Sequence, residues 1–185
     1  MEPPAITRHR RPFLAPLWVG ALVALAVGLV AFGVYRSATT TVVFLVRPLE
    51  KDPGTIADPP VSPEGEERAE RLAHMFGDSG GAGGIDAVYM SDDRRALQTG
   101  APLIERLHRA PVVFAAADAR AAAARALREH GGGTVLMIAS GPLLAQVVEE
   151  LAGVKLPAGA QEDPNLICVV SIPTVGRARV VRFRY

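Results

Sequence analysis

Only one cysteine occurs in the 185 residues, which excludes an internal disulfide and leaves the redox compartment of the protein open. Aromatic residues are scarce (5%), and the formal net charge is only +1. Residues 40–185 contain 16 basic and 18 acidic residues, so they offer no excess positive charge to follow a phosphate backbone. We therefore expect no nucleic-acid partner. Cys168 lies in the largely apolar run 166–172 and is predicted to be a buried core residue.

One long apolar run is present near the start of the chain. From Leu17 to Tyr35 there are 19 consecutive residues without a charge. As a helix this run would extend about 28 Å, close to the ~30 Å thickness of the hydrocarbon core of a bilayer. Trp18 and Tyr35 lie near its two ends, where amphipathic rings prefer to sit. The run predicts a transmembrane helix over residues 17–35, preceded by a cytoplasmic segment (1–16) and followed by a linker (36–40).

The charges around this run predict its orientation. Arg8, Arg10 and Arg11 precede it, whereas Arg36 alone follows it closely. Under the positive-inside rule the N-terminus is cytoplasmic, and the rest of the chain is periplasmic or extracellular. A cleaved signal peptide is the main alternative, but the apolar run exceeds the usual 7–15 residues and no clear A-x-A site follows. A buried soluble helix is a poorer alternative because the run has no polar face.

Small residues recur at four-residue spacing within the same run, at Gly20, Ala24 and Gly28. Such a stripe allows two membrane helices to approach closely, so it predicts a homodimer through these three positions. The alternative is that glycine and alanine are simply common in apolar spans. The sequence alone leaves both interpretations open.

Strand and helix patterns alternate from residue 41 to the end of the chain. Predicted strands cover residues 41–46, 85–90, 112–115, 134–139, 166–172 and 178–183, and predicted helices cover 62–76, 92–108, 118–129 and 142–151. Ser62 and Pro63 are suited to the N-cap and first position of the first of these helices. Pro102 should kink or weaken the second. The order predicts one α/β domain over 41–185, a three-layer α/β/α sandwich with a mostly parallel sheet that ends in a hairpin.

Charged and polar residues follow the carboxyl ends of the predicted strands, which is where a parallel sheet would place a binding site. Arg47 and Glu50 come after the first strand, Asp92 and Arg95 after the second, and Ser140 after the fourth. Two arginines at neighbouring strand ends favour an oxyanion pocket, because a guanidinium group matches phosphate geometry. The alternative is that each arginine pairs with a nearby acid such as Glu50 or Asp92.

Four segments resemble motifs of the histidine phosphatase superfamily, the phosphoglycerate-mutase-like fold. Leu45–Lys51 (LVRPLEK) resembles the opening L-x-R-H-[GA]-E signature, and Val61–Gly65 resembles the L-[ST]-x-x-G segment of the first helix. Asp86–Thr99 is similar to the run that ends in R-A-x-Q-T, and Gly133–Ser140 resembles the strand before the G-H-S motif. The resemblance extends over about residues 41–185, in the family's order. It implies a phosphoglycerate-mutase-like fold. We also expect no cofactor and no metal.

The resemblance also implies roles for particular residues. Arg47 and Arg95 match the two arginines that hold the transferred phosphoryl group in the family. The nucleophilic histidine, however, falls on Pro48, and the second phosphate-binding histidine falls on Ser140. The catalytic acid has no clear counterpart. Asp118 is the nearest carboxylate, and its place before an alanine-rich helix favours an N-cap instead.

Without an imidazole nitrogen at position 48 the covalent phosphohistidine route is closed, since proline has no nucleophilic side chain. The four histidines, His9, His74, His108 and His130, do not match the required strand ends. Three functions remain open. The domain could bind a phosphate-bearing or other anionic ligand, act as a structural or protein-interaction module of the cell envelope, or hydrolyse phosphomonoesters by another route. The C-terminal arginines could contact anionic lipid or could line the solvated side of an edge strand.

Overall fold

The computed structural model describes residues 17–38, 40–50, 58–77, 84–157, 159–160, 163 and 165–184. The chain divides into two compact units, Met1–Arg36 and Ser37–Tyr185. Helix α1 (Leu17–Ala38) confirms the helix predicted for the apolar run, and every side chain from Trp18 to Val34 is exposed. Within the described ranges, however, no helix is both long enough and apolar enough to span a membrane, so the transmembrane prediction is not supported. The predicted cytoplasmic segment, 1–16, lies outside the described residues.

The second unit is built on a six-stranded mixed sheet with the order β3-β2-β4-β1-β5-β6. Its strands are β1 (Thr40–Val46), β2 (Ala87–Ser91), β3 (Val112–Phe114), β4 (Thr134–Ile138), β5 (Leu166–Pro173) and β6 (Arg179–Arg184). Strands β1 to β4 are parallel, whereas β5 is antiparallel to both of its neighbours, β1 and β6. The predicted hairpin and the mostly parallel sheet are therefore confirmed.

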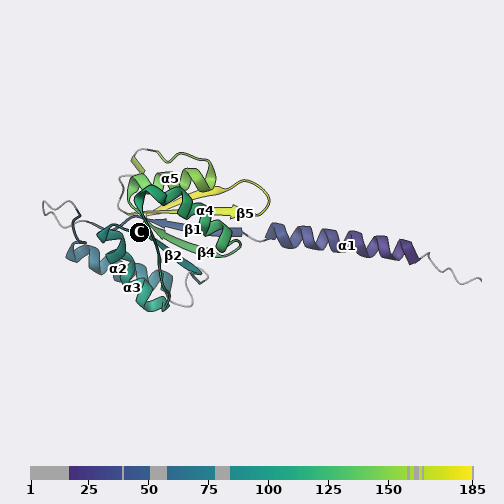
Figure 1. Ribbon diagram of the computed structural model, residues 1–185, viewed down its shortest axis with the longest axis horizontal. Coiled ribbons are helices and arrows are strands. Elements are labelled where there is room, and N and C mark those ends of the chain that lie inside the picture. The colour runs from purple at the N-terminus through teal and green to yellow at the C-terminus, as the bar shows by residue number, and fades with distance from the viewer. Residues whose placement is uncertain are drawn as a thin grey trace, which may run out of the picture. The chain divides into compact units, whose positions relative to one another are not determined.

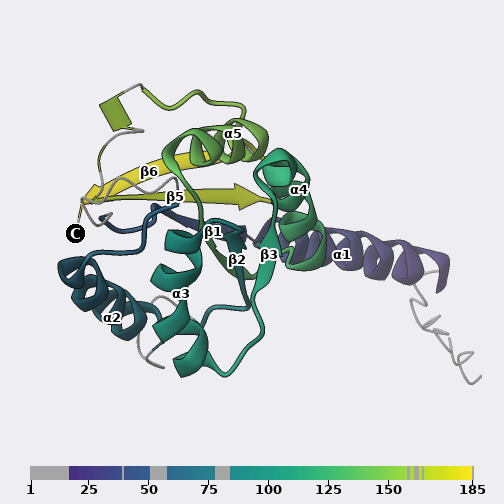
Figure 2. The ribbon, with the colours of Figure 1, turned by 60° about the vertical axis from the view of Figure 1, so that its left-hand side comes forward.

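Helices cover both faces of this sheet (Figure 1). One face carries α2 (Pro63–Gly77) and α3 (Arg94–Leu107), and the other carries α4 (Ala119–Glu129) and α5 (Gly141–Ala152); the short 3-10 helix η1 (Ala116–Asp118) precedes α4. Figure 2 shows the same layers from another side, with β5 and β6 beside α5. The three-layer α/β/α arrangement follows from the buried, β-branched strands, which are apolar on both sides and need a helix layer on each.

Alternating residues of the central strands supply the two cores. Val43 and Leu45 of β1 pack on the α4–α5 side with Cys168, which is fully buried as predicted. Val46 packs on the α2–α3 side, where the rings of Phe44 and Phe76 lie 5.0 Å apart in an edge arrangement. This division is the two-residue period of a strand that is buried on both faces.

Local capping signals determine where the helices begin. Ser62 accepts a hydrogen bond from Gly65 N (3.2 Å), which confirms Ser62 as the N-cap of α2. Asp93 caps α3 by accepting from Ala96 N at 2.9 Å. Pro102 lies inside α3, so that helix continues through the proline rather than ending there.

Candidate functional site

The strand register brings the ends of three parallel strands to one level. Val46 of β1 is paired with Ile138 of β4, which is paired with Met90 of β2. Two hydrogen bonds continue this alignment: Ala139 N donates to Val46 O (3.1 Å), and Ser91 Oγ to Ile138 O (3.4 Å). The next residues along each strand therefore leave the sheet at the same edge. This edge is where an open α/β sheet presents its binding site.

Arg47 and Pro48 leave this edge from β1. Arg47 is partly buried, and its Nε and Nη1 atoms are inaccessible to solvent. Pro48 and Leu49 are buried. Because guanidinium groups ionise at any physiological pH, Arg47 places a fixed positive charge at low solvent exposure beside the end of β1. Proline at position 48 adds neither a side-chain donor nor a backbone N–H to this place.

The second strand contributes Arg95, which lies in the first turn of α3 and is partly buried. The start of α3 is fixed by two acids. Asp93 caps the helix and also accepts a hydrogen bond from Ser91 Oγ, while both carboxylate oxygens of Asp58 accept from Arg94 N at 3.2–3.3 Å. Arg95 is thus carried on a helix terminus whose backbone is tied to β2 and to the loop before α2.

Two residues just after Arg95 hold the loops that surround the edge. Thr99 Oγ1 accepts a buried hydrogen bond from Leu49 N at 3.2 Å, and Gln98 Oε1 accepts from Val61 N at 2.9 Å. These are the Gln and Thr of the R-A-x-Q-T segment. Their side chains connect α3 to the backbone that follows β1, so they position Arg95 and Arg47 relative to each other.

Strand β4 ends at Ile138, and Ala139 and Ser140 lead directly into α5. Ser140 occupies the N-cap position, but its side chain makes no capping hydrogen bond within the described residues, and Pro142 lies at the start of the helix. The first backbone N–H groups of α5 and the positive end of its dipole therefore lie at the same edge as Arg47. Such a terminus favours an anion.

Glu50 is paired with an arginine that the sequence patterns did not single out. Arg68 Nη1 of α2 donates to Glu50 Oε1, and its Nη2 donates to Asn165 Oδ1. The side chain of Arg68 is 14% exposed. Helix α2 therefore supplies Glu50 with a cation of its own. No local pattern could reveal a contact across 97 residues of sequence.

The start of β5 is a further part of this edge that the sequence patterns did not reveal. Because β5 is antiparallel to β1, the pair Val46↔Ile167 places the segment before β5 beside Arg47. There Asp163 accepts from Asn165 N (3.0 Å) and from Arg184 Nε (2.7 Å). The Asn165 amide, then the Arg184 and Arg47 guanidinium groups, hold the pKa of the Asp163 carboxyl below its usual value. A cavity of about 550 Å³ lies here, lined by residues that include Asp163, Leu166 and Arg184.

The described histidines lie away from this edge, as predicted. His74 is within α2 and contacts Arg106 (Nε2 to Nη2, 3.0 Å), His108 ends α3, and His130 ends α4 with its ring edge-on to Tyr89. Asp118 takes the N-cap position of α4, as expected, yet makes no capping hydrogen bond with the described residues. No group of three or more metal-ligating side chains occurs among the residues the structure describes.

Comparisons with known proteins agree with this geometry. Residues 48–117 match the family model of the histidine phosphatase superfamily (branch 1). No curated protein matches the sequence. The chain is similar in structure to the protein histidine phosphatase SixA, solved with tungstate, at TM-score 0.60 and 19% identity over 77% of this chain and 96% of that one.

Two other solved structures illustrate the range of these relatives. A mycobacterial glucosyl-3-phosphoglycerate phosphatase aligns at TM-score 0.58 and 17% identity, covering 78% of this chain and 99% of that one. Phosphoglycerate mutase from Plasmodium falciparum aligns at TM-score 0.54 and 18% identity, covering 78% and 91% of the two chains. At these identities the likeness concerns the fold. The second unit of this chain has a histidine-phosphatase-like fold.

Proposed function

We propose that the domain of residues 41–185 binds a phosphate-bearing or other anionic ligand at the edge where β1, β2 and β4 end, without catalysing phosphoryl transfer. The observation that carries the proposal is the register Val46–Ile138–Met90, because it brings Arg47, the start of α3 and the start of α5 to one place. These three elements supply positive charge from three directions.

The chemistry of the edge suits an oxyanion. The guanidinium group of Arg47 has buried nitrogens and forms stronger hydrogen bonds to an anion than it would in water. Arg95 offers a second fork from α3, and the N-terminus of α5 offers backbone donors. The phosphatase relatives named above act on phosphorylated compounds, which supports phosphate as the first anion to test.

Catalytic inactivity is part of the proposal and rests on two side chains. Pro48 occupies the position that matches the nucleophilic histidine, and proline cannot form a phosphoryl intermediate. Ser140 occupies the position of the second histidine; its hydroxyl can donate one hydrogen bond but brings no charge to the transferring group. A family member with these two residues retains the means to bind but loses the means to transfer.

Thermal denaturation of the full chain with orthophosphate or tungstate tests the binding. We expect a rise in Tm at millimolar anion, because a ligand at 100 times its Kd stabilises the folded state by about 2.7 kcal/mol. The rise should vanish in Arg95→Ala and in Arg47→Lys, which retains the charge but loses the fork. Arg128→Ala is the matched control, since Arg128 is exposed near the end of α4. Equal shifts in all three variants would refute the site.

A phosphatase assay tests the inactivity. We expect no turnover of p-nitrophenyl phosphate by the native chain, and measurable turnover by the Pro48→His, Ser140→His double variant. Turnover by the native chain that Arg47→Lys abolishes would instead establish a phosphomonoester hydrolase. If neither anion binding nor turnover is found, a structural or protein-interaction module of the cell envelope becomes the better proposal.

Membrane association through the N-terminal unit is a separate proposal, supported by the sequence. Its support is the uncharged run 17–35 together with the exposure of every side chain from Trp18 to Val34. The arginines at positions 8, 10 and 11 support a cytoplasmic N-terminus and an extracytoplasmic domain. Extraction of cell membranes with alkaline carbonate tests the association. Release of the chain into the soluble fraction would refute it.

The same run supports a homodimer through Gly20, Ala24 and Gly28. A Cβ atom added at Gly20 or Gly28 would meet no atom within 4 Å, so a partner helix could approach both positions closely. We expect Gly20→Ile with Gly28→Ile to reduce cross-linked dimer in detergent. Unchanged cross-linking would refute this interface.

A further inference from the structure

The charge of the second unit is concentrated in its last two strands. Residues 166–185 contain four arginines and no acidic residue, whereas residues 40–165 contain 12 basic and 18 acidic residues. The β5–β6 hairpin is therefore a positive segment on an otherwise acidic domain. Among the described residues, Arg184 is paired with Asp163. The hairpin has no acidic residue of its own to pair with Arg177, Arg179 or Arg182.

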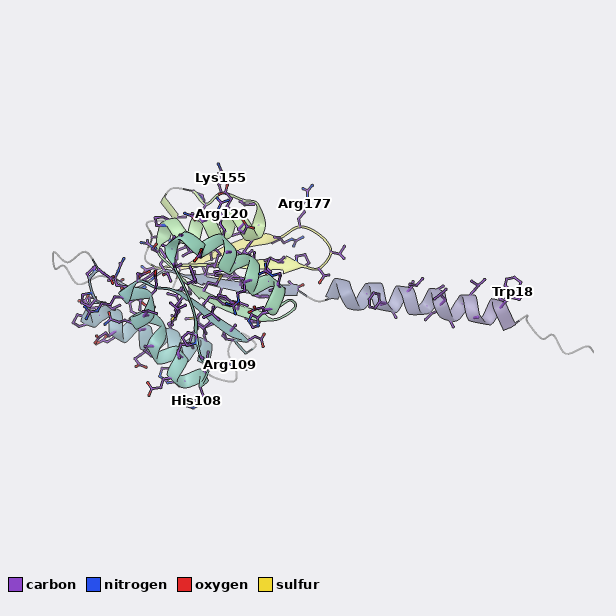
Figure 3. All side chains as sticks on the ribbon, in the orientation of Figure 1. Trp18, His108, Arg109, Arg120, Lys155 and Arg177 are labelled. Atoms are coloured by element: carbon purple, nitrogen blue, oxygen red, sulfur yellow. The ribbon has the colours of Figure 1, made fainter. Side chains whose placement is uncertain are left out.

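Apolar side chains are exposed among these arginines. Val175 at the tip of the hairpin is 66% exposed, and Val181 and Phe183 of the edge strand β6 are 46% and 54% exposed. Gly176 adopts φ +125° at the tip, a conformation that favours glycine and lets the chain turn sharply between Val175 and Arg177. Arg177 extends away from this turn into solvent (Figure 3). The tip thus presents one exposed apolar side chain two residues before an exposed arginine.

The tip lies at the opposite end of the strands from the proposed anion site. Pro173 is paired with Thr40, the first residue of β1, whereas Val46 at the other end of β1 leads to Arg47. Only residue 39 separates Thr40 from the end of α1. Thr40, the first residue of the sheet, is therefore at the same ends of the strands as the hairpin tip.

We propose that the tip of the β5–β6 hairpin, residues 174–179, binds the surface of an anionic lipid bilayer. Arg177 and Arg179 would pair with lipid phosphates, and Val175 would enter the headgroup region. Each arginine near an anionic surface raises affinity about fivefold, and the effect weakens as salt shortens the Debye length. A second copy of the chain is a poorer occupant, because two arginine-rich edge strands repel each other.

A fluorescent probe at the tip of the full chain tests the proposal. Val175→Cys would be labelled with an environment-sensitive dye, which is feasible because the native Cys168 is buried. Ala116→Cys is the matched control, because Ala116 is exposed and follows the C-terminal end of β3, at the opposite end of the strands from the hairpin tip. We expect phosphatidylcholine vesicles containing phosphatidylglycerol to shift and brighten the emission from position 175 but not from 116. Pure phosphatidylcholine vesicles should give a much weaker response at 175.

If α1 itself inserts into the vesicle, the probes at positions 175 and 116 are both carried to the same surface. A difference between the two positions then still reports on the hairpin tip. Arg177→Glu with Arg179→Glu should reduce the response at 175 at least severalfold, and the neutral pair Arg177→Gln with Arg179→Gln should reduce it partly. Equal responses at 175 and 116, or a response that survives charge reversal, would overturn the proposal. A response to a soluble polyglutamate peptide in place of vesicles would also overturn it, in favour of an acidic protein partner. Orthophosphate binding should be unchanged in these variants, so the outcome is independent of the anion site.

Discussion

Replacing Arg68 with methionine removes a side chain of helix α2 that connects the loop after β1 to the start of β5. The guanidinium group donates to Glu50 Oε1 and to Asn165 Oδ1, and its side chain is only 14% exposed. Glu50 Oε2 is already buried without a hydrogen-bond partner among the described residues. The substitution would therefore leave the Glu50 carboxylate with neither oxygen bonded to a described donor.

The cost can be estimated from these contacts. Breaking a buried ion pair by removing one partner costs about 3–5 kcal/mol, whereas an exposed pair is worth about 0–1 kcal/mol. The Glu50 side chain is 35% exposed, so water recovers part of its solvation. We expect a loss of about 2 kcal/mol, which for a domain of this size lowers Tm by roughly 6 °C. Methionine retains most of the apolar stem of arginine, so the packing term should be small.

Urea denaturation of four proteins measures the interaction: the native chain, Arg68→Met, Glu50→Gln and the double variant. The coupling energy from this cycle should exceed 1 kcal/mol. Arg125→Met is the matched control, because Arg125 pairs with Glu129 one helical turn away and both side chains are about half exposed. It should cost less than about 0.5 kcal/mol. If Arg68→Met destabilises no more than Arg125→Met, the network does not stabilise the edge.

Three further predictions concern the core. Gly100→Ala should cost about 1–3 kcal/mol despite the better helix propensity of alanine, because the new Cβ would clash with Sδ of the buried Met90. Urea denaturation measures this cost, and a gain in stability would contradict the packing. Burial raises the pKa of the Cys168 thiol. The reaction of this thiol with Ellman's reagent should therefore be slow until urea unfolds the chain. Equal rates in the folded and unfolded states would contradict the burial of Cys168. Burial, then the charge of Glu129, raises the pKa of Tyr89 in the folded state. The free energy of unfolding should therefore be constant below the pKa of an unfolded tyrosine, near 10, and should fall as the pH rises above it. Tyr89→Phe should reduce that fall.

The sequence predicted the elements well because each is marked locally. Ser62 and Asp93 cap α2 and α3, and the alternating strand and helix patterns are regular enough to locate all six strands and the four helices of the domain. The strand ends that carry Arg47 and Arg95 follow from that order alone, since parallel strands end at one edge.

The parts of the site that the sequence did not reveal are those made by distant contacts. Arg68 looks like any surface cation of an amphipathic helix, and only the packing of α2 against the loop after β1 turns it toward Glu50. Asp163 follows a helix and precedes a strand with no motif around it. Asp163 reaches the edge because β5 runs antiparallel to β1. That direction depends on which strands pair, and no residue near position 163 reveals it.

The residues of the resembling motifs fall into two groups by what they do in the structure. Gln98 and Thr99 hold the backbones of Val61 and Leu49, and Glu50 anchors Arg68, so these side chains maintain the shape of the edge. The positions that the resemblance assigns to the two histidines hold Pro48 and Ser140 in this sequence. The side chains that shape the edge are therefore present without an imidazole at either position, which is the combination that binding without phosphoryl transfer requires.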